Sequence, residues 1–203
     1  GLGDVYKRQG WKGGVNKRAV AELTLGAILA MSRNLFQQDT ELKAGDWNPI
    51  FGRNLSGKSV GIIGLGHIGK EVAKFVKMFG CDVFVNDTKD LRDYCLENGL
   101  HFVDINILIA SSNIITLHIP LDESTKHMIN EKTFSGMKQD AFIINTCRGG
   151  VVSETALYDF LKTHPRAKAF FDVFEEEPPT KNPLINLDNF HSCLLYTSPS
   201  PRD

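Results

Sequence analysis

The chain has 203 residues, of which 42% are hydrophobic and 23% charged, a size and composition that suit one globular domain with a buried core. Its 23 basic and 24 acidic residues leave a formal net charge of −1 and form no basic stripe, which argues against nucleic acid and anionic membranes as partners. No apolar run approaches the roughly 20 residues that span a bilayer, and the N-terminus lacks the order of a signal peptide, so we expect a cytoplasmic protein.

The four cysteines predict neither a metal site nor a redox motif. They form no CxxC pair, and no cluster of histidine and cysteine has the spacing of zinc ligands. We therefore expect reduced thiols and no bound metal. The cysteines are Cys81, Cys95, Cys147 and Cys193.

Both ends of the chain differ in character from the rest. The opening GLGDVYKRQ and the closing CLLYTSPSPRD resemble translated adaptor or vector sequence, so we expect residues 1–9 and 193–203 to lie outside the fold. The alternative is that they are natural disordered tails.

The first predicted element is a helix from Val20 to Phe36, where apolar residues recur at helical spacing. A polar connection with glycine and proline follows from Leu42 to Gly57. A strand from Ser59 to Ile63 then runs into a glycine-rich turn, and a helix follows from Ile68 to Phe79. Strand, glycine turn and helix thus succeed one another directly.

Strands and helices alternate through the rest of the chain. Four more apolar segments are predicted strands: Asp82–Asn86, Ile114–His118, Ala141–Asn145 and Lys168–Asp172. Three predicted helices each begin at a residue suited to capping: Asp104–Ala110, Asn130–Met137 and Ser153–Lys162. This alternation predicts an α/β fold with a doubly wound parallel sheet of the Rossmann type, which binds ligands beyond the carboxyl ends of its strands.

The segment from Gly64 to Gly69 reads GLGHIG and fits the pattern GxGxxG. The first glycine permits a tight turn, the second lets the backbone approach a diphosphate, and the third lets helix pack on strand. The helix N-terminus would then face the anion. A glycine-rich turn without a ligand is the alternative.

Asp87 supports a dinucleotide site, because it stands 18 residues after Gly69 at the end of the second strand. A carboxylate there can accept hydrogen bonds from the adenosine ribose and would repel a 2′-phosphate, which favours NAD. Lys89 nearby leaves room for NADP, and Asp87 could instead be a turn residue.

Two later strand ends carry charged residues. Arg148 follows the strand that ends at Asn145, and an arginine fixed there can grip a carboxylate through two hydrogen bonds and polarise a neighbouring carbonyl. A solvated loop arginine is the alternative, and Cys147 is predicted to be a packing residue. The segment from Asp172 to Pro178 reads DVFEEEP, where one carboxylate could accept from a nicotinamide amide and another could support a histidine.

Together and in this order, these motifs resemble the NAD-binding domain of the D-isomer-specific 2-hydroxyacid dehydrogenases, the family of phosphoglycerate dehydrogenase, glyoxylate and hydroxypyruvate reductases and D-lactate dehydrogenase. The resemblance covers about Gly14 to Ser192 and includes AVAELTLG, GLGHIG, HIPL, NTCRGG and DVFEEEP. It implies an NAD-dependent oxidoreductase that moves hydride between the cofactor and a small D-2-hydroxy or 2-oxo acid such as phosphoglycerate, glyoxylate or hydroxypyruvate. Residues 57–192 would form the NAD-binding domain, and residues 10–56 a helix and connection to a substrate domain that is largely missing.

The resemblance also implies site residues. The cofactor would contact Gly64, Gly66, His67, Ile68 and Gly69 at the diphosphate, Asp87 at the ribose, Ile119 and Pro120 near the adenine, and Thr146, Cys147, Arg148 and Asp172 at the nicotinamide end. Arg148 matches the arginine that holds the substrate carboxylate. Glu177 matches the glutamate that hydrogen-bonds the catalytic histidine and raises its pKa.

That histidine would follow Glu177 in a Pro-His pair, yet at that place the sequence reads Cys193-Leu194-Leu195. His191 comes too early for this role and is expected to end a strand. His118, at a strand end, is expected to contribute its backbone and not a proton. Three more histidines lie in segments predicted to be surface: His101, His127 and His164. The resemblance therefore implies that this chain binds NADH but turns over no 2-oxo acid alone.

Two further implications concern partners and the class of protein. The complete enzyme would be a homodimer, with the helix from Val20 to Phe36 joining the domains and contributing to the dimer. The alternative function is a non-catalytic NADH-sensing module, like the corepressor relatives of the family.

Overall fold

The computed structural model describes residues 16–193 and contains one parallel sheet of seven strands. The strands lie in the order β3-β2-β1-β4-β5-β6-β7, and every neighbouring pair is parallel. Their bounds are β1 Ser59–Ile63, β2 Asp82–Asn86, β3 His101–Phe102, β4 Ile114–Leu117, β5 Phe142–Asn145, β6 Lys168–Phe171 and β7 Phe190–Ser192. The predicted doubly wound α/β fold is confirmed.

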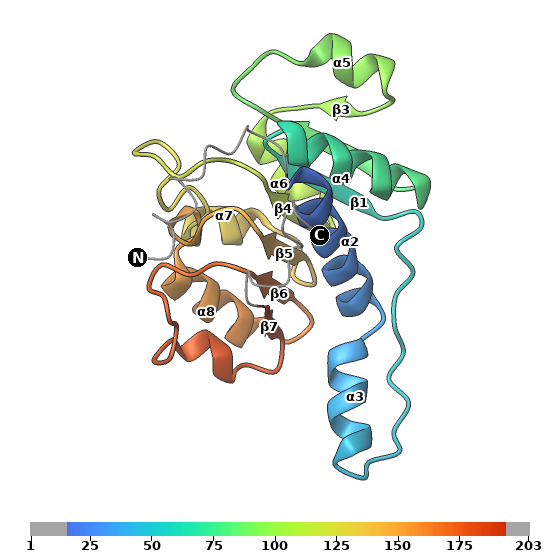
Figure 1. Ribbon diagram of the computed structural model, residues 1–203, viewed down its shortest axis with the longest axis vertical. Coiled ribbons are helices and arrows are strands. Elements are labelled where there is room, and N and C mark those ends of the chain that lie inside the picture. The colour runs from blue at the N-terminus through green and yellow to red at the C-terminus, as the bar shows by residue number, and fades with distance from the viewer. Residues whose placement is uncertain (1–15, 194–203) are drawn as a thin grey trace.

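Helices cover both faces of the sheet (Figure 1). On one face lie α2 (Lys17–Ser32) and α4 (His67–Met78), with α5 (Arg92–Glu97) near the β3 edge; on the other lie α6 (Ile105–Ser111), α7 (Glu131–Gly136) and α8 (Glu154–Thr163). The described residues also form two short 3-10 helices, η1 (Gly149–Val151) and η2 (Pro183–Asn186).

The strands are apolar on both faces because each face is packed against helices. In β5, Ile143 belongs to the core beside α6, α7 and α8, and Ile144 to the core beside α2 and α4. In β6, Phe171 belongs to the core beside α6, α7 and α8, and Phe170 to the core beside α2 and α4. This two-sided burial accounts for the unbroken apolar runs in the sequence.

The three predicted N-caps are confirmed, since each side chain accepts from the backbone of the first helical turn. Asp104 accepts from the amide of Asn106, Asn130 from those of Lys132 and Thr133, and Ser153 from that of Ala156. Each cap satisfies an amide that has no partner within its helix.

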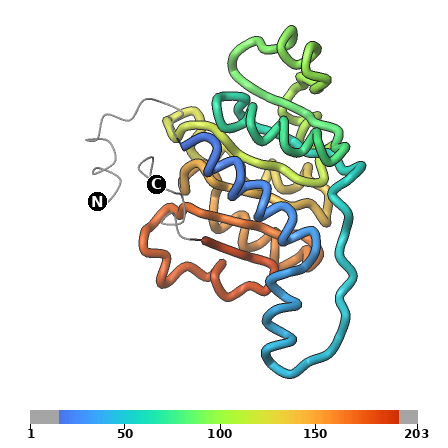
Figure 2. Tube along the Cα trace, turned by 45° about the vertical axis from the view of Figure 1, so that its right-hand side comes forward, coloured from blue at the N-terminus to red at the C-terminus, as the bar shows by residue number. Residues whose placement is uncertain are grey.

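The prediction of one helix from Val20 to Phe36 was wrong. α2 ends at Ser32, Asn34 adopts a left-handed conformation with φ 54°, and α3 runs separately from Leu35 to Lys43 at 60° to α2. Asparagine tolerates this conformation better than most residues. Figures 1 and 2 show α3 and the extended segment after it projecting from the body of the molecule.

Two short elements, β3 and α5, escaped prediction, whereas a strand ending at His191 was expected. His191 lies in the middle of β7, not at the end of a strand. Within residues 16–193 no single helix is long and apolar enough to cross a membrane, and α2 and α3 pass that test only as a bent pair. The predicted tails, residues 1–9 and 193–203, lie outside the described residues except for Cys193.

Candidate functional site

Four of the predicted site residues stand in one row along the carboxyl edge of the sheet. The strand registers pair Ile63 with Asn86 and Leu117, Leu117 with Asn145, and Asn145 with Phe171. The residue after each of these therefore stands in one row, which runs in strand order as Asp87, Gly64, His118, Thr146 and Asp172. Sequence spacing alone did not give this row.

The three glycines of the turn meet different surroundings. Gly64 has φ +93°, and a Cβ there would lie 2.6 Å from the carbonyl oxygen of His118. A Cβ on Gly69 would lie 2.1 Å from the carbonyl oxygen of Gly64, which is where α4 packs on β1. Gly66 has no protein atom within 4 Å of its Cβ position. The fold itself thus requires glycine at 64 and 69, whereas the space beside Gly66 is open.

The N-terminus of α4 opens onto that same space. Gly66 is its N-cap residue, so no side chain accepts from the first amides, and both Gly66 and His67 are exposed. The first amides of a helix have no intrahelical partner and carry a partial positive charge, which together suit an anion such as a diphosphate.

Asp87 contacts the glycine turn directly. Its Oδ2 accepts from the amide of Leu65 at 2.7 Å, and its Oδ1 accepts from the amide of Lys89 at 2.9 Å. The carboxylate is half-buried at the end of β2, beside the open space at Gly66. It is therefore placed both to shape the turn and to accept from ligand hydroxyl groups.

The end of β4 supports the turn from the other side. His118 is half-buried, and desolvation of its ring lowers its pKa to about 3. Its Nε2 lies 3.0 Å from Oγ1 of Thr116. No hydrogen-bond partner in the described residues reaches its Nδ1. His118 is thus neutral at physiological pH. Ile119 lies against Gly64, and Pro120 is exposed.

Asn145 shapes the turn after β5, a role that the sequence analysis missed. Its Nδ2 donates to the carbonyl of Arg148 at 2.8 Å, and its Oδ1 accepts from the amide of Cys147 at 3.1 Å. Asparagine often closes such turns with its side chain, so its place directly before the loop was the available signal. Burial raises the pKa of the Cys147 thiol, which suits a packing residue better than a nucleophile.

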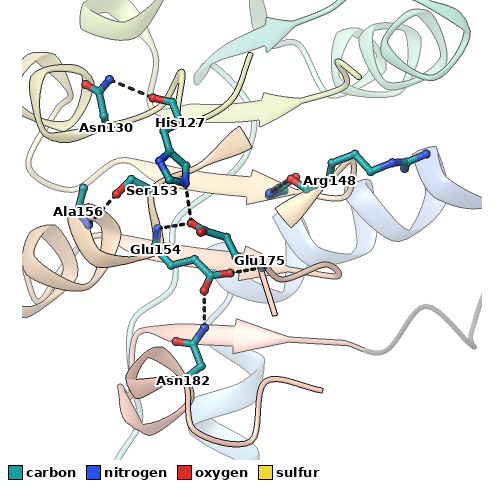
Figure 3. A network of polar contacts seen from close by, with 9 residues as sticks. His127, Asn130, Arg148, Ser153, Glu154, Ala156, Glu175 and Asn182 are labelled. Carbon is teal, nitrogen blue, oxygen red and sulfur yellow. Dashed lines mark hydrogen bonds and ion pairs between the residues drawn. The ribbon is translucent and has the colours of Figure 1, made fainter. Parts of the chain in front are cut away.

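Arg148 points away from the polar network beside it (Figure 3). Its side chain is exposed, and its Nη1 donates to the carbonyl of Cys147 at 2.6 Å. The next residue, Gly149, is buried so closely that a Cβ would lie 2.0 Å from the backbone of Phe174. This contact fixes the loop after β6 against the turn that carries Arg148.

Asp172 is the most unusual carboxylate of the row. It is 6% exposed, and its Oδ1 has no hydrogen-bond partner among the described residues. Burial, with a smaller contribution from the charge of Glu177, raises the pKa of Asp172 to about 6. Glu177 is exposed and its Oε1 accepts from the amide of Phe174 at 3.2 Å. Asp172 thus offers a buried acceptor at the edge of the sheet.

A reciprocal pair of glutamates holds the same loop (Figure 3). Glu154 Oε1 accepts from the amide of Glu175 at 2.8 Å, and Glu175 Oε1 accepts from the amide of Glu154 at 3.3 Å. Glu175 Oε1 also lies 3.1 Å from Nε2 of His127, and Asn182 donates to Glu154 Oε2 at 2.6 Å. The acidic cluster after β6 is therefore partly a structural clamp, which the sequence analysis did not predict.

The other histidines lie away from the row. His101 stacks on Phe84, His164 on Phe160, and His191 lies against Phe36. Burial lowers the pKa of His191 to about 4. None of these contacts places a histidine beside Arg148 or Glu177 within residues 16–193.

Three observations fit a bound dinucleotide. The space beside Gly66 admits the backbone approach of a diphosphate, the amides of α4 lack a side-chain cap, and Asp172 has a buried oxygen without a partner. These features lie on strands next to or near one another at one edge. The residues present therefore suit NAD.

Comparison with known proteins agrees with this assignment. Residues 25–193 match the family described as D-isomer specific 2-hydroxyacid dehydrogenase, NAD binding domain. The chain is 44% identical over 174 residues to the D-3-phosphoglycerate dehydrogenase of Methanocaldococcus jannaschii, covering 84% of this chain and 33% of that protein. It is 40% identical over 182 residues to the hydroxypyruvate reductase of Thermotoga maritima, covering 87% and 58%.

A solved structure shows the same fold. The phosphoglycerate oxidoreductase of Vibrio cholerae superposes with a TM-score of 0.82 at 34% identity, covering 87% of this chain and 58% of that one. The chain thus spans between about a third and three fifths of the length of these relatives. None of the three is described as a corepressor, so the non-catalytic alternative receives no support.

Proposed function

Because the chain belongs to the D-isomer-specific 2-hydroxyacid dehydrogenases, through their NAD-binding domain, we propose that it is the cofactor-binding part of an oxidoreductase acting on a small D-2-hydroxy or 2-oxo acid. Phosphoglycerate, hydroxypyruvate and glyoxylate are the substrate candidates, since relatives at 44%, 40% and 40% identity are named D-3-phosphoglycerate dehydrogenase, hydroxypyruvate reductase and glyoxylate reductase. When bound, the nicotinamide supplies the hydride acceptor or donor.

One observation carries the proposal: the register brings Asp87, Gly64, Thr146 and Asp172 to one edge of the sheet. The uncapped amides at the start of α4 suit the diphosphate, and the carboxylate of Asp87 suits the ribose hydroxyls. Ile119 and Pro120 are proposed to contact the adenine side. Thr146 and Asp172 are proposed to lie at the nicotinamide end, with Cys147 and Arg148 beside them.

The proposed catalytic residues of this chain are Arg148 and Glu177. The guanidinium of Arg148 is exposed at the carboxyl edge, where it can bind the substrate carboxylate and withdraw electron density from the neighbouring carbonyl. Glu177 lies near Asp172, and its exposed carboxylate can accept a hydrogen bond from a catalytic imidazole. Residues 57–192 are proposed as the NAD-binding domain, with residues 10–56 leading to the substrate domain.

Titration calorimetry of NADH into the folded chain tests the cofactor assignment. We expect saturable binding that weakens when Asp87 is replaced by alanine. A folded chain that binds no NADH would contradict the assignment.

An assay of the full-length protein with NADH and glyoxylate, hydroxypyruvate or phosphohydroxypyruvate tests the reaction. Arg148→Lys in that protein should lower kcat/KM by about 100-fold or more because a bidentate contact is lost.

The proposed partner is a second copy of the chain. α3 and the segment after it form one projecting arm, since Asn34 donates to the carbonyl of Phe51 and Gln38 to that of Ile50. The arm exposes Trp47 by 84% and Phe51 by 93%. Apolar exposure of this extent is typical of an interaction surface. Cytoplasmic location stays a prediction from composition.

A further inference from the structure

Thr24 and Thr146 form a buried contact between two elements far apart in the sequence. Thr24 lies on α2, Thr146 directly follows β5, and their Oγ1 atoms are 3.2 Å apart. Thr24 is fully buried and Thr146 is 7% exposed. This contact joins the first described helix to the proposed cofactor edge.

The direction of this hydrogen bond follows from counting protons. Thr24 Oγ1 donates to the carbonyl oxygen of Val20 at 2.8 Å, and a threonine hydroxyl has a single proton. Thr24 can therefore only accept in its contact with Thr146. The hydroxyl proton of Thr146 is then directed toward α2, and the lone pairs of its oxygen are left to accept at the cofactor edge.

We propose that Thr24 is a positioning residue that fixes the hydroxyl of Thr146 as a hydrogen-bond acceptor toward the cofactor. The inference rests on the proposed NAD binding and deepens it. The cofactor group that contacts the Thr146 hydroxyl must donate a hydrogen bond to it. This group is either a hydroxyl of the nicotinamide ribose or the amino group of the carboxamide. A diphosphate oxygen, which can only accept, is excluded from this position.

The rest of the row is consistent with this polarity. The uncapped backbone amides at the start of α4 present donors next to β1, whereas Asp172, directly after β6, presents an acceptor oxygen without a partner among the described residues. Thr146 directly follows β5, which lies between β4 and β6, and so extends the acceptor side by one strand. The edge therefore changes from donors, which suit phosphate, to acceptors, which suit ribose hydroxyl or amide groups.

The test is a double-mutant cycle on NADH affinity with Thr24→Val and Thr146→Val. Valine keeps the shape of threonine but cannot accept a hydrogen bond. We expect Thr24→Val to weaken NADH binding by about tenfold, equal to about 1.4 kcal/mol, because the Thr146 hydroxyl loses its buried acceptor. In the Thr146→Val background the same change should have no further effect. Thr24→Ser, which retains the hydroxyl, should bind NADH within about twofold of the unaltered chain.

Two additions make the outcomes distinct. Ser112 is also buried and donates to the carbonyl four residues before it, but at the amino end of β4, so Ser112→Ala is the matched control and should leave NADH affinity unchanged.

The 3-acetylpyridine analogue of NADH lacks the carboxamide N–H groups. If the donor is the carboxamide, the threonine variants will bind this analogue as the unaltered chain does; if it is the ribose, they will lose affinity for it.

The proposal about Thr24 is overturned if Thr24→Val binds NADH normally, or if the two valine substitutions have additive effects. It also falls if Thr24→Ser loses as much affinity as Thr24→Val. In each of these cases the unaltered chain still binds NADH, so the proposed function survives. Absence of NADH binding by the unaltered, folded chain would defeat both.

Discussion

Asp87 accepts a hydrogen bond from the backbone amide of Leu65 at 2.7 Å, across 22 residues of sequence. Leu65 lies inside the glycine turn, between Gly64 and Gly66. The carboxylate assigned to the ribose therefore also holds the loop assigned to the diphosphate. Under the proposed assignment, two parts of the dinucleotide would contact groups that are hydrogen-bonded to each other, so a change at Asp87 should affect both.

We expect Asp87→Ala to lower NADH affinity by about 100-fold and the free energy of unfolding by about 1–2 kcal/mol, since a hydrogen bond to a charged acceptor is lost at the turn. Asp87→Asn keeps one acceptor oxygen and should lose less of both. Calorimetry and urea unfolding give the two quantities. Asp82→Ala, at the exposed start of the same strand, is the control. Unchanged stability in Asp87→Ala would show that the contact with Leu65 does not hold the turn.

The glycines of the turn should separate binding from stability. Gly66→Ala adds a methyl group where no protein atom lies within 4 Å, so its free energy of unfolding should stay within about 0.5 kcal/mol while NADH affinity falls at least tenfold. Gly69→Ala would place a Cβ 2.1 Å from a carbonyl oxygen and should cost more than about 2 kcal/mol of stability. Urea unfolding and NADH titration of both variants check this. Normal NADH binding by Gly66→Ala would show that the diphosphate does not bind in that space.

The sequence allowed prediction of the fold where local signals are strong. β1 and β2 were predicted with their observed bounds, and β4, β5 and β6 to within one residue, because strands buried on both faces are continuous apolar runs. β3 has two residues, too few for any pattern to stand out, and the strand expected to end at His191 continues by one residue to Ser192. The break at Asn34 was missed because the apolar spacing continues across it into Leu35.

The candidate site was predictable in its outline but not in its contacts. Strand ends in a parallel sheet must meet at one edge, so Asp87 and Asp172 could be grouped from the sequence. The partners of these groups come from distant segments, as with Thr24 and Thr146 or with His127 and Glu175. Such pairs depend on how helices and loops pack, and spacing along one segment carries no information about them.

The elevated pKa of Asp172 predicts a pH-dependent loss of stability. Burial raises this pKa from 3.8 to about 6, so between these values the folded chain binds more protons than the unfolded chain, and its stability falls as pH rises. The amide side chain introduced by Asp172→Asn does not titrate, so this variant does not lose stability in this way as pH rises. Its free energy of unfolding should exceed that of the unaltered chain by up to about 3 kcal/mol at pH 7.5 and approach it near pH 4. Urea unfolding across this range measures the difference, and a constant difference would contradict the prediction.

The reciprocal glutamates predict a local effect at the loop after β6. Glu154→Ala removes the acceptors for the amide of Glu175 and for the side chain of Asn182. We expect the free energy of unfolding to fall by about 2 kcal/mol and the Glu175 amide to exchange with deuterium at least tenfold faster. Hydrogen exchange followed by mass spectrometry resolves this loop. Asp159→Ala, an exposed carboxylate on the same helix, should change neither quantity, and equal exchange in the two variants would show that Glu154 does not hold the loop.

If the dimer forms through the projecting arm, substitutions of its exposed aromatic residues should dissociate it. Trp47 and Phe51 are among the most exposed large apolar side chains of the described residues, and a second copy would remove both from water. The double variant Trp47→Ser, Phe51→Ser should therefore shift the chain from dimer to monomer in light scattering, with a dissociation constant raised at least 100-fold, because burying two aromatic side chains contributes several kcal/mol. Leu96→Ser is the control, since Leu96 is 81% exposed on α5, away from the arm. A dimer that survives the arm substitutions would place the interface elsewhere, and a chain that is monomeric without them would contradict the proposed partner.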